Sequence, residues 1–379
     1  TSLLELCFPS LNIGMDLDFS CLEETDLVKI LFSEKVGLIL QSNFNLNRSF
    51  SKNGIKAYKI GFVNQSSSLK IGNNNISINE MRKEWMKTST QFELKQTNSE
   101  LALLRLDNVL KQPLKFKFPI EFNGKRPLQK IKQLNAAVIR EKGSNSEREM
   151  AYMMDLCGFK VRDVHMTDLI EGRETLEDIQ LLVAVGGFSN SDVLGSAKGW
   201  AGAFKYNTKA KAALENFFSR TDTLSLGVCN GCQLFIELGL LYTNHIQKPK
   251  MMHNKSGKFE CIFTAVNIKP SSSIMLKGLE GSILGIWAAH GEGRFSFPKA
   301  EINYQIPAKY LYEEYPSNPN GSDFNAAMLV SDNGRHLVMM PHLERSTFPW
   351  NWGHYPNNRK DEVSPWILAF ENAYNWLKK

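Results

Sequence analysis

The chain has 379 residues, with 45 Lys and Arg against 39 Asp and Glu, a net charge of +6 and 42% hydrophobic residues. That length and composition indicate a soluble globular protein with a sizeable core. The Lys residues are scattered and no apolar run reaches about 18 residues, so neither nucleic-acid binding nor a membrane span is expected. Six cysteines without regular spacing argue against a disulfide framework and favour a reducing, cytoplasmic compartment.

The first segment, residues 1–125, is predicted to be a smaller α+β domain. Strands are predicted at 14–19, 36–41, 55–62 and 69–71, and helices at 26–32, capped by Thr25, and at 78–86. The strand at 36–41 is expected to be buried. The chain lacks an initiator Met and opens in what resembles the second half of a helix stopped by Pro9, which predicts a fragment of a longer polypeptide. This segment contains no Gly-rich phosphate-binding motif.

A Lys-rich connector is predicted at 96–134, and a regular α/β pattern follows it. Strands predicted at 136–139, 159–165, 179–185 and 224–228 alternate with helices, the first of which begins with a capping box from Ser146 to Glu149. This alternation is typical of a doubly wound, mostly parallel sheet, so 126–379 is predicted to be one α/β domain. Asp332-Asn-Gly334 predicts a hairpin, and the last helix is expected to start at Ser364.

Cys229 occupies a sharp turn between a predicted strand and a predicted helix. It stands in Gly227-Val-Cys-Asn-Gly-Cys-Gln233, after the strand at 224–228 and before an apolar helical stretch. Such a turn is a nucleophile elbow, which exposes the side chain at the sheet edge beside a helix N-terminus. The helix dipole and its free N–H groups favour a thiolate, so Cys229 is a candidate nucleophile.

A candidate base stands far downstream, in Met340-Pro-His-Leu-Glu-Arg345. If the segment is extended, His342 and Glu344 point to the same side, and the carboxylate orients the imidazole. Cys229, His342 and Glu344 are therefore predicted to form a catalytic triad.

Other interpretations of these residues stay open at this point. A lone cysteine on a strand is more often a core residue, and an isolated His-x-Glu is more often a surface pair. Cys229 and Cys232 have the spacing of a redox pair, although Gly and Asn fill the motif. A zinc site would need a second ligand pair, and none with that spacing is present.

The motif around Cys229 resembles the G-x-C-x-G-x-Q nucleophile motif of class I, triad-type glutamine amidotransferases. The form with Asn230 and Cys232 is similar to the formylglycinamidine ribonucleotide synthases, large single-chain ligases of purine synthesis. Further segments of 136–379 carry the resemblance: Val185-Gly-Gly-Phe-Ser-Asn-Ser-Asp-Val-Leu-Gly195, Ala289-His-Gly-Glu-Gly-Arg294, Tyr315-Pro-Ser-Asn-Pro-Asn-Gly-Ser322 and Met340-Pro-His-Leu-Glu-Arg345. The resemblance is looser over 1–125, which is similar to the C-terminal part of the second synthetase half.

The resemblance implies a flavodoxin-like glutaminase domain that hydrolyses the glutamine side chain through a Cys229 thioester. The backbone N–H groups of Gly187 and Asn230 are the expected oxyanion donors. The family positions near the glutamine pocket are Phe188, Gln233, Asn254, Ser256 and His290, although Gly291 and Gly293 also suit a tight loop in which His290 only bonds backbone.

The resemblance also implies partners beyond glutamine. These are the upstream synthetase domains of the same polypeptide, with ATP and Mg²⁺ serving the full-length ligase and no cofactor in this fragment, which is expected to retain only the glutaminase half. Two alternatives are another α/β cysteine hydrolase or peptidase of the same fold and a catalytically silent binding module. The matches at 188–195 and 290–294 argue against the first, and the intact triad argues against the second.

Overall fold

The computed structural model describes residues 2–111, 115–127 and 134–379. The chain forms two compact units, Thr1–Lys95 and Gln96–Lys379. The boundary predicted at residue 125 falls inside the second unit, because the described part of the connector packs there. Thr97 Oγ1 donates to the Ser256 carbonyl at 2.7 Å, and Lys117 forms a β-bridge with Ile283. Residues 112–114 and 128–133 of the predicted connector lie outside the described residues.

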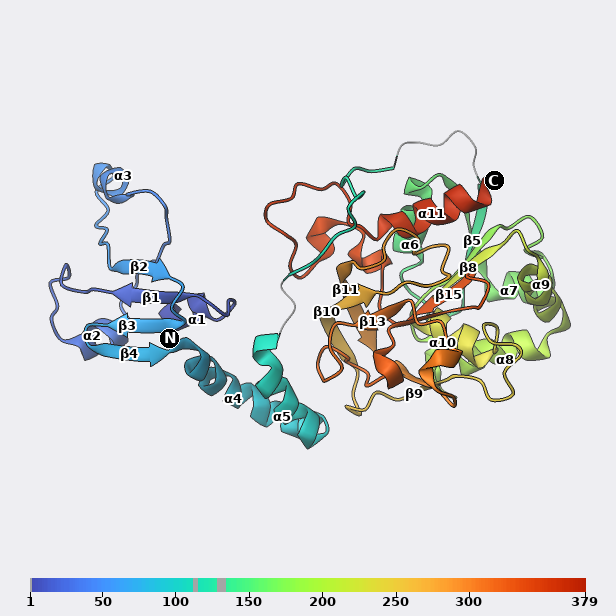
Figure 1. Ribbon diagram of the computed structural model, residues 1–379, viewed down its shortest axis with the longest axis horizontal. Coiled ribbons are helices and arrows are strands. Elements are labelled where there is room, and N and C mark those ends of the chain that lie inside the picture. Colours follow the sequence, from blue (N-terminus) through green and yellow to red (C-terminus); the bar gives the residue numbers. More distant parts are fainter. Residues whose placement is uncertain (1, 112–114, 128–133) are drawn as a thin grey trace. The chain divides into compact units, whose positions relative to one another are not determined.

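The first unit is built on a four-stranded mixed sheet in the order β2-β1-β3-β4 (Figure 1). β1 pairs antiparallel with β2 and parallel with β3, and a small apolar core containing Cys7, Met15 and Ile78 packs beside the sheet. The strands are β1 (Gly14–Leu17), β2 (Gly61–Asn64), β3 (Ser68–Ile71) and β4 (Asn74–Ser77), and the helices are α1 (Ser2–Cys7), α2 (Leu27–Phe32), α3 (Asn47–Lys52) and α4 (Ile78–Gln96).

Three predictions for the first unit are wrong. The strand predicted at 55–62 begins only at Gly61, with β2. The segment 36–41 is no strand and is exposed, with Val36 and Leu38 at 106% and 91%, because no strand in the described part of the chain pairs with it. The cap of α2 is Asp26, whose carboxylate accepts from the Val28 N–H at 2.9 Å, and not Thr25.

The second unit is organised around a six-stranded sheet in the order β14-β15-β8-β7-β5-β6. All neighbours are parallel except β14 and β15, which form the predicted hairpin. The predicted doubly wound, mostly parallel fold is therefore confirmed. The strands are β5 (Leu134–Arg140), β6 (Phe159–His165), β7 (Leu181–Ala184), β8 (Leu224–Val228), β14 (Met328–Val330) and β15 (His336–Met339).

Helices flank this sheet on both sides (Figure 1). α6 packs against β5, β6 and α11, whereas α10 packs against β7, β8 and α8. The central strands are buried on both faces, as their continuous apolar sequences require. The helices of this unit are α5 (Ser99–Asp107), α6 (Glu147–Leu156), α7 (Met166–Glu171), α8 (Lys198–Tyr206), α9 (Thr208–Ser219), α10 (Asn230–Glu237) and α11 (Ile367–Leu377).

The second unit also contains a separate antiparallel sheet, formed by three strands between residues 260 and 310. It has the order β11-β10-β13, with β11 (Ile283–His290), β10 (Glu260–Ile268) and β13 (Ala308–Tyr310), and a separate pair is formed by β9 (Lys250–Met252) and β12 (Arg294–Ser296). The bridge from Trp287 of β11 to His342 connects this sheet to the segment after β15. None of the helices in the described ranges has both the length and the apolar character needed to cross a membrane.

The predicted capping box of α6 is also wrong. Ser146 has φ 67° and makes no side-chain cap. Its hydroxyl instead accepts from Arg345 Nε at 3.0 Å and approaches Asn145 Oδ1 at 3.3 Å. A tertiary contact from a residue 199 positions away therefore overrides the local capping pattern.

Candidate active site

Cys229 lies on the turn between β8 and α10 with φ 52° and ψ −106°. A residue with a Cβ rarely adopts this conformation, and such strain is typical of nucleophile elbows. The turn is tight because α10 approaches β7 closely: a Cβ on Gly231 would lie 2.0 Å from the Ala184 carbonyl oxygen. Cys229 is 5% exposed, and its thiol approaches the Ala289 carbonyl at 3.6 Å.

His342 and Glu344 form a buried ion pair at the end of β15. His342 Nδ1 is 2.6 Å from Glu344 Oε1, and the two side chains are each 1% exposed. The extended geometry expected for this segment is wrong, because Leu343 is helical (φ −71°, ψ −32°) and Glu344 begins a 3₁₀ turn. The pair forms because His342 N–H donates to the Trp287 carbonyl at 2.7 Å and the chain then turns back.

The imidazole also lies next to the thiol. A Cβ built on Gly186, just after β7, would be 2.8 Å from His342 Cε1 and 3.4 Å from Cys229 Cβ, so both side chains pack against this glycine. The carboxyl ends of β7, β8 and β15 thus bring together residues more than a hundred positions apart in the chain, as parallel sheets do with ligand sites.

Electrostatics favour a proton on His342. Burial lowers the pKa of His342, but the Glu344 carboxylate and the Cys229 thiol outweigh burial and raise it to about 9. Burial would raise the pKa of Glu344, yet His342 and Arg345 hold it below its usual value. A thiol, a strong imidazole base and a carboxylate that orients the base are the parts that covalent acyl transfer requires.

The expected oxyanion donors flank the thiol. Gly187 has φ 124°, and a Cβ there would lie 2.5 Å from the Gly143 carbonyl oxygen, so glycine is needed. Asn230 is the first residue of α10, where backbone N–H groups are free of helical bonds. Within the described ranges, the backbone N–H of Gly187 and that of Asn230 donate to no protein acceptor. Their role stays a prediction.

The five residues expected at the glutamine pocket differ in their exposure. Phe188 is 48% exposed and its ring lies 5.9 Å from that of Phe259, at the surface. The other four, Gln233, Asn254, Ser256 and His290, are buried. Asn254 Nδ2 donates to the His290 carbonyl at 2.7 Å, so it also holds the loop after β11. Contact with glutamine stays a prediction for all five.

His290 is held in its neutral form. Burial, and then the charge of His342, lowers the pKa of His290 to about 3. Its Nε2 lies 3.3 Å from Asn320 Nδ2, which in turn donates to the Tyr310 hydroxyl at 3.1 Å. The sequence motif at 315–322 drew attention to this segment without giving Asn320 a role, because nothing local places it beside His290.

The redox interpretation of Cys229 and Cys232 finds no support in the structure. Both cysteines are free, and Cys232 is completely buried on α10. Burial, followed by the neighbouring Cys229, raises the pKa of Cys232 well above its usual value. A buried thiol of this kind is chemically inert.

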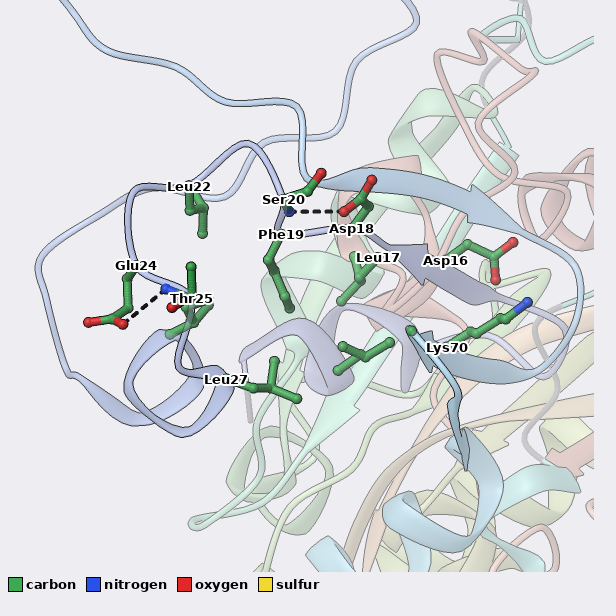
Figure 2. Close-up of a pocket in the computed structure, with 13 residues that line it drawn as sticks. Asp16, Leu17, Asp18, Phe19, Ser20, Leu22, Glu24, Thr25, Leu27 and Lys70 are labelled. Carbon is green, nitrogen blue, oxygen red and sulfur yellow. Dashed lines mark hydrogen bonds between the residues drawn. The ribbon is translucent and has the colours of Figure 1, made fainter.

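A separate cavity lies in the first unit, and its lining residues are distant in the sequence from Cys229, His342 and Glu344. It measures about 500 Å³ and is lined by the turn after β1 and by the end of β3. Figure 2 shows Asp16, Asp18, Glu24 and Lys70 around it. Across the described residues, no group of three or more His, Cys, Asp or Glu side chains has the arrangement of a metal site.

Comparison with known proteins assigns this chain to a family. Residues 133–377 match the model of the CobB/CobQ-like glutamine amidotransferase domain. The chain belongs to that family. The resemblance inferred from the nucleophile motif is thereby confirmed, and the matched residues lie within the second compact unit.

Longer proteins resemble the whole chain. A probable phosphoribosylformylglycinamidine synthase, chloroplastic/mitochondrial, of Arabidopsis thaliana is 39% identical over 99% of this chain and 29% of its own length. The phosphoribosylformylglycinamidine synthases of Dictyostelium discoideum and Homo sapiens are 36% and 34% identical over 98% and 99% of this chain. The chain spans 32% and 31% of those two proteins, about a third of their length.

A solved structure shares the fold of this amidotransferase. A chain of the PurLQS structure from Thermotoga maritima superposes with a TM-score of 0.51 at 24% identity, over 65% of this chain and 100% of that one.

Proposed function

We propose that this amidotransferase chain is the glutaminase portion of a phosphoribosylformylglycinamidine synthase. The observation that carries the proposal is the buried Cys229, His342 and Glu344 constellation at the carboxyl ends of β8 and β15, with the 2.6 Å Nδ1–Oε1 contact at its centre. The substrate is glutamine, and the products are glutamate and ammonia.

In the proposed reaction, the Cys229 thiol proton is transferred to His342 before the sulfur attacks the side-chain amide carbon of glutamine. The oxygen of the tetrahedral intermediate accepts hydrogen bonds from the backbone N–H groups of Gly187 and Asn230. The C–N bond then breaks, and the imidazolium gives its proton to the leaving ammonia. Water, deprotonated by His342, hydrolyses the thioester and releases glutamate.

Glu344 has no contact with substrate in this scheme. It holds the Nδ1 side of the imidazole and stabilises the imidazolium that forms in both halves of the reaction. The raised pKa of His342, about 9, is the expected property of such a base.

The wider reaction follows from the names of the relatives. The ammonia would serve the ATP-dependent conversion of formylglycinamide ribonucleotide to formylglycinamidine ribonucleotide, in the cytoplasm. ATP and Mg²⁺ would act in the synthetase portion.

Labelling with a diazoketone analogue of glutamine tests the proposed nucleophile. Such reagents bind as glutamine does and alkylate the attacking thiol. We expect one adduct, located on Cys229 by peptide mass spectrometry, and none in Cys229→Ala, which should also lose glutamine hydrolysis while keeping its fold. Cys261→Ala is the control, since Cys261 is a free and exposed thiol.

The same experiment separates the alternatives. A chain whose Cys229 is labelled by a general thiol reagent, but which is neither labelled by the analogue nor able to hydrolyse glutamine, would be a different cysteine hydrolase. A chain that binds glutamine without releasing ammonia would be the silent binding module. Hydrolysis at an equal rate by Cys229→Ala would reject the triad.

A further inference from the structure

The side chain of Asn230 is buried in a chain of amide hydrogen bonds. Its Oδ1 accepts from the Ser189 backbone N–H at 3.2 Å, and its Nδ2 donates to Gln233 Oε1 at 3.0 Å. Gln233 Nε2 then donates to the Glu292 carbonyl at 2.9 Å. Asn230 is 0% exposed and Gln233 is 4% exposed. The bonds connect three elements at the site: the loop after β7, helix α10 and the loop after β11.

The direction of these bonds is determined by their two ends. The Ser189 N–H can only donate, and the Glu292 carbonyl can only accept. If the amides were rotated, Asn230 Nδ2 would face a donor and Gln233 Oε1 would face an acceptor. Only a side chain that accepts at one atom and donates at another fits at position 230, where a buried unpaired group would be costly.

The loop that Asn230 contacts is held by its surroundings. The backbone N–H groups of Phe188 and Asn190 donate to the carbonyls of Gly143 and Lys142, and that of Ser189, between them, donates to Asn230. Asn190, Ser191 and Asp192 are three consecutive residues with φ between 51° and 56°, in the left-handed region. Such residues keep this conformation only where the surroundings impose it. The loop begins at Gly187, the predicted oxyanion donor, only two residues before the amide that Asn230 binds.

We propose that the Asn230 side chain is a positioning residue that fixes the Gly187 N–H relative to the N–H of Asn230 itself, and so builds the oxyanion hole. One residue supplies a donor through its backbone and places the second donor through its side chain. This inference rests on the proposed glutaminase function. In it, Asn230 contacts the substrate only through its backbone N–H, and its side chain acts by positioning Gly187.

The test compares Asn230→Leu with the wild-type chain. Leucine has a similar size and removes both hydrogen bonds. Misplacing one oxyanion donor is expected to lower kcat for glutamine hydrolysis about 10- to 100-fold with little change in KM, since the oxyanion exists only beyond the ground state. Alkylation of Cys229 by iodoacetamide forms no oxyanion, so its rate should match that of the wild type.

Two further measurements keep the result interpretable. Asn372→Leu is the matched control, because the Asn372 amide also binds backbone carbonyls, those of Met275 and Lys277, but lies on α11 outside the site. It should keep its kcat. Hydrogen–deuterium exchange of peptides covering 187–195 should rise in Asn230→Leu only. If Asn230→Leu does not fold, Asn230→Ala, which adds no bulk, is measured instead.

The outcomes separate the two proposals. A wild-type chain that does not hydrolyse glutamine overturns the proposed function and this inference with it. If the wild-type chain is active and the Asn230 variant keeps its kcat, with or without a higher KM, this inference alone is overturned. Equal losses in kcat and in alkylation would also overturn it, because the variant would then have displaced the thiol itself.

Discussion

Replacing Glu344 by Gln tests whether the carboxylate acts through His342. The change keeps the size of the side chain and removes its charge, at a position where the carboxylate oxygen is 2.6 Å from His342 Nδ1 and both groups are buried. We expect glutamine hydrolysis to lose kcat while KM changes little, because Glu344 is placed to stabilise an imidazolium that forms during the reaction.

The size of the loss follows from the pKa of His342. The pKa is raised from 6.5 to about 9 against the opposing effect of burial. At about 1.4 kcal/mol for each pKa unit, the net preference for the imidazolium is about 3–4 kcal/mol. Glu344 is the largest contributor that raises this pKa, so its removal should lower kcat at least about 100-fold.

Steady-state ammonia release by the wild type and by Glu344→Gln measures this effect. Glu237→Gln is the control, since Glu237 pairs with Lys205 on the surface at 3.0 Å and should leave both constants unchanged. An unchanged kcat with a raised KM would place Glu344 in substrate binding and refute the reasoning.

Three further outcomes are expected. Because the folded pKa of His342 is above 6.5, the protonated imidazole contributes its full stability below pH 6.5, and this contribution is lost as the pH rises through about 9. The free energies of unfolding of the wild type and of Glu344→Gln, measured in urea, should therefore differ more at pH 6.5 than above pH 9. An equal difference at both pH values would argue against the pair. Gly231→Ala, whose Cβ would lie 2.0 Å from the Ala184 oxygen, should destabilise the chain by about 1–3 kcal/mol in the same assay. Trp366→Ala, at a fully buried position, should cost about 3–5 kcal/mol, measured by thermal unfolding.

Strands β5, β7 and β8 could be predicted from the sequence because each is a short, largely apolar run followed by helical sequence, whereas the edge strand β6 mixes apolar and charged residues. The prediction at 159–165 matches β6, and the prediction at 224–228 matches β8. Strands that are buried on both faces require continuous apolar runs, so the local composition is enough to predict a parallel sheet covered by helices.

Three predictions failed because contacts distant in the sequence, or their absence, decided the local structure. The apolar stretch at 36–41 has strand composition, but a strand needs a partner for its backbone groups, and none pairs with it in the described part of the chain. Ser146 has a capping pattern, yet its hydroxyl contacts Arg345 instead. The triad pair was predicted for an extended backbone, whereas the backbone turns at Leu343.

The sequence by itself determined which chemical groups are available: a cysteine on a tight turn, a histidine followed two residues later by a glutamate, and glycines at the strand ends. Only the tertiary structure decided that these groups meet. The contact of Cys229 and His342 depends on the parallel pairing of β8 with β15, and the raised pKa of His342 depends on a buried carboxylate at 2.6 Å. Distance and burial are properties of the packed chain, because electrostatic interactions strengthen only where the fold excludes water.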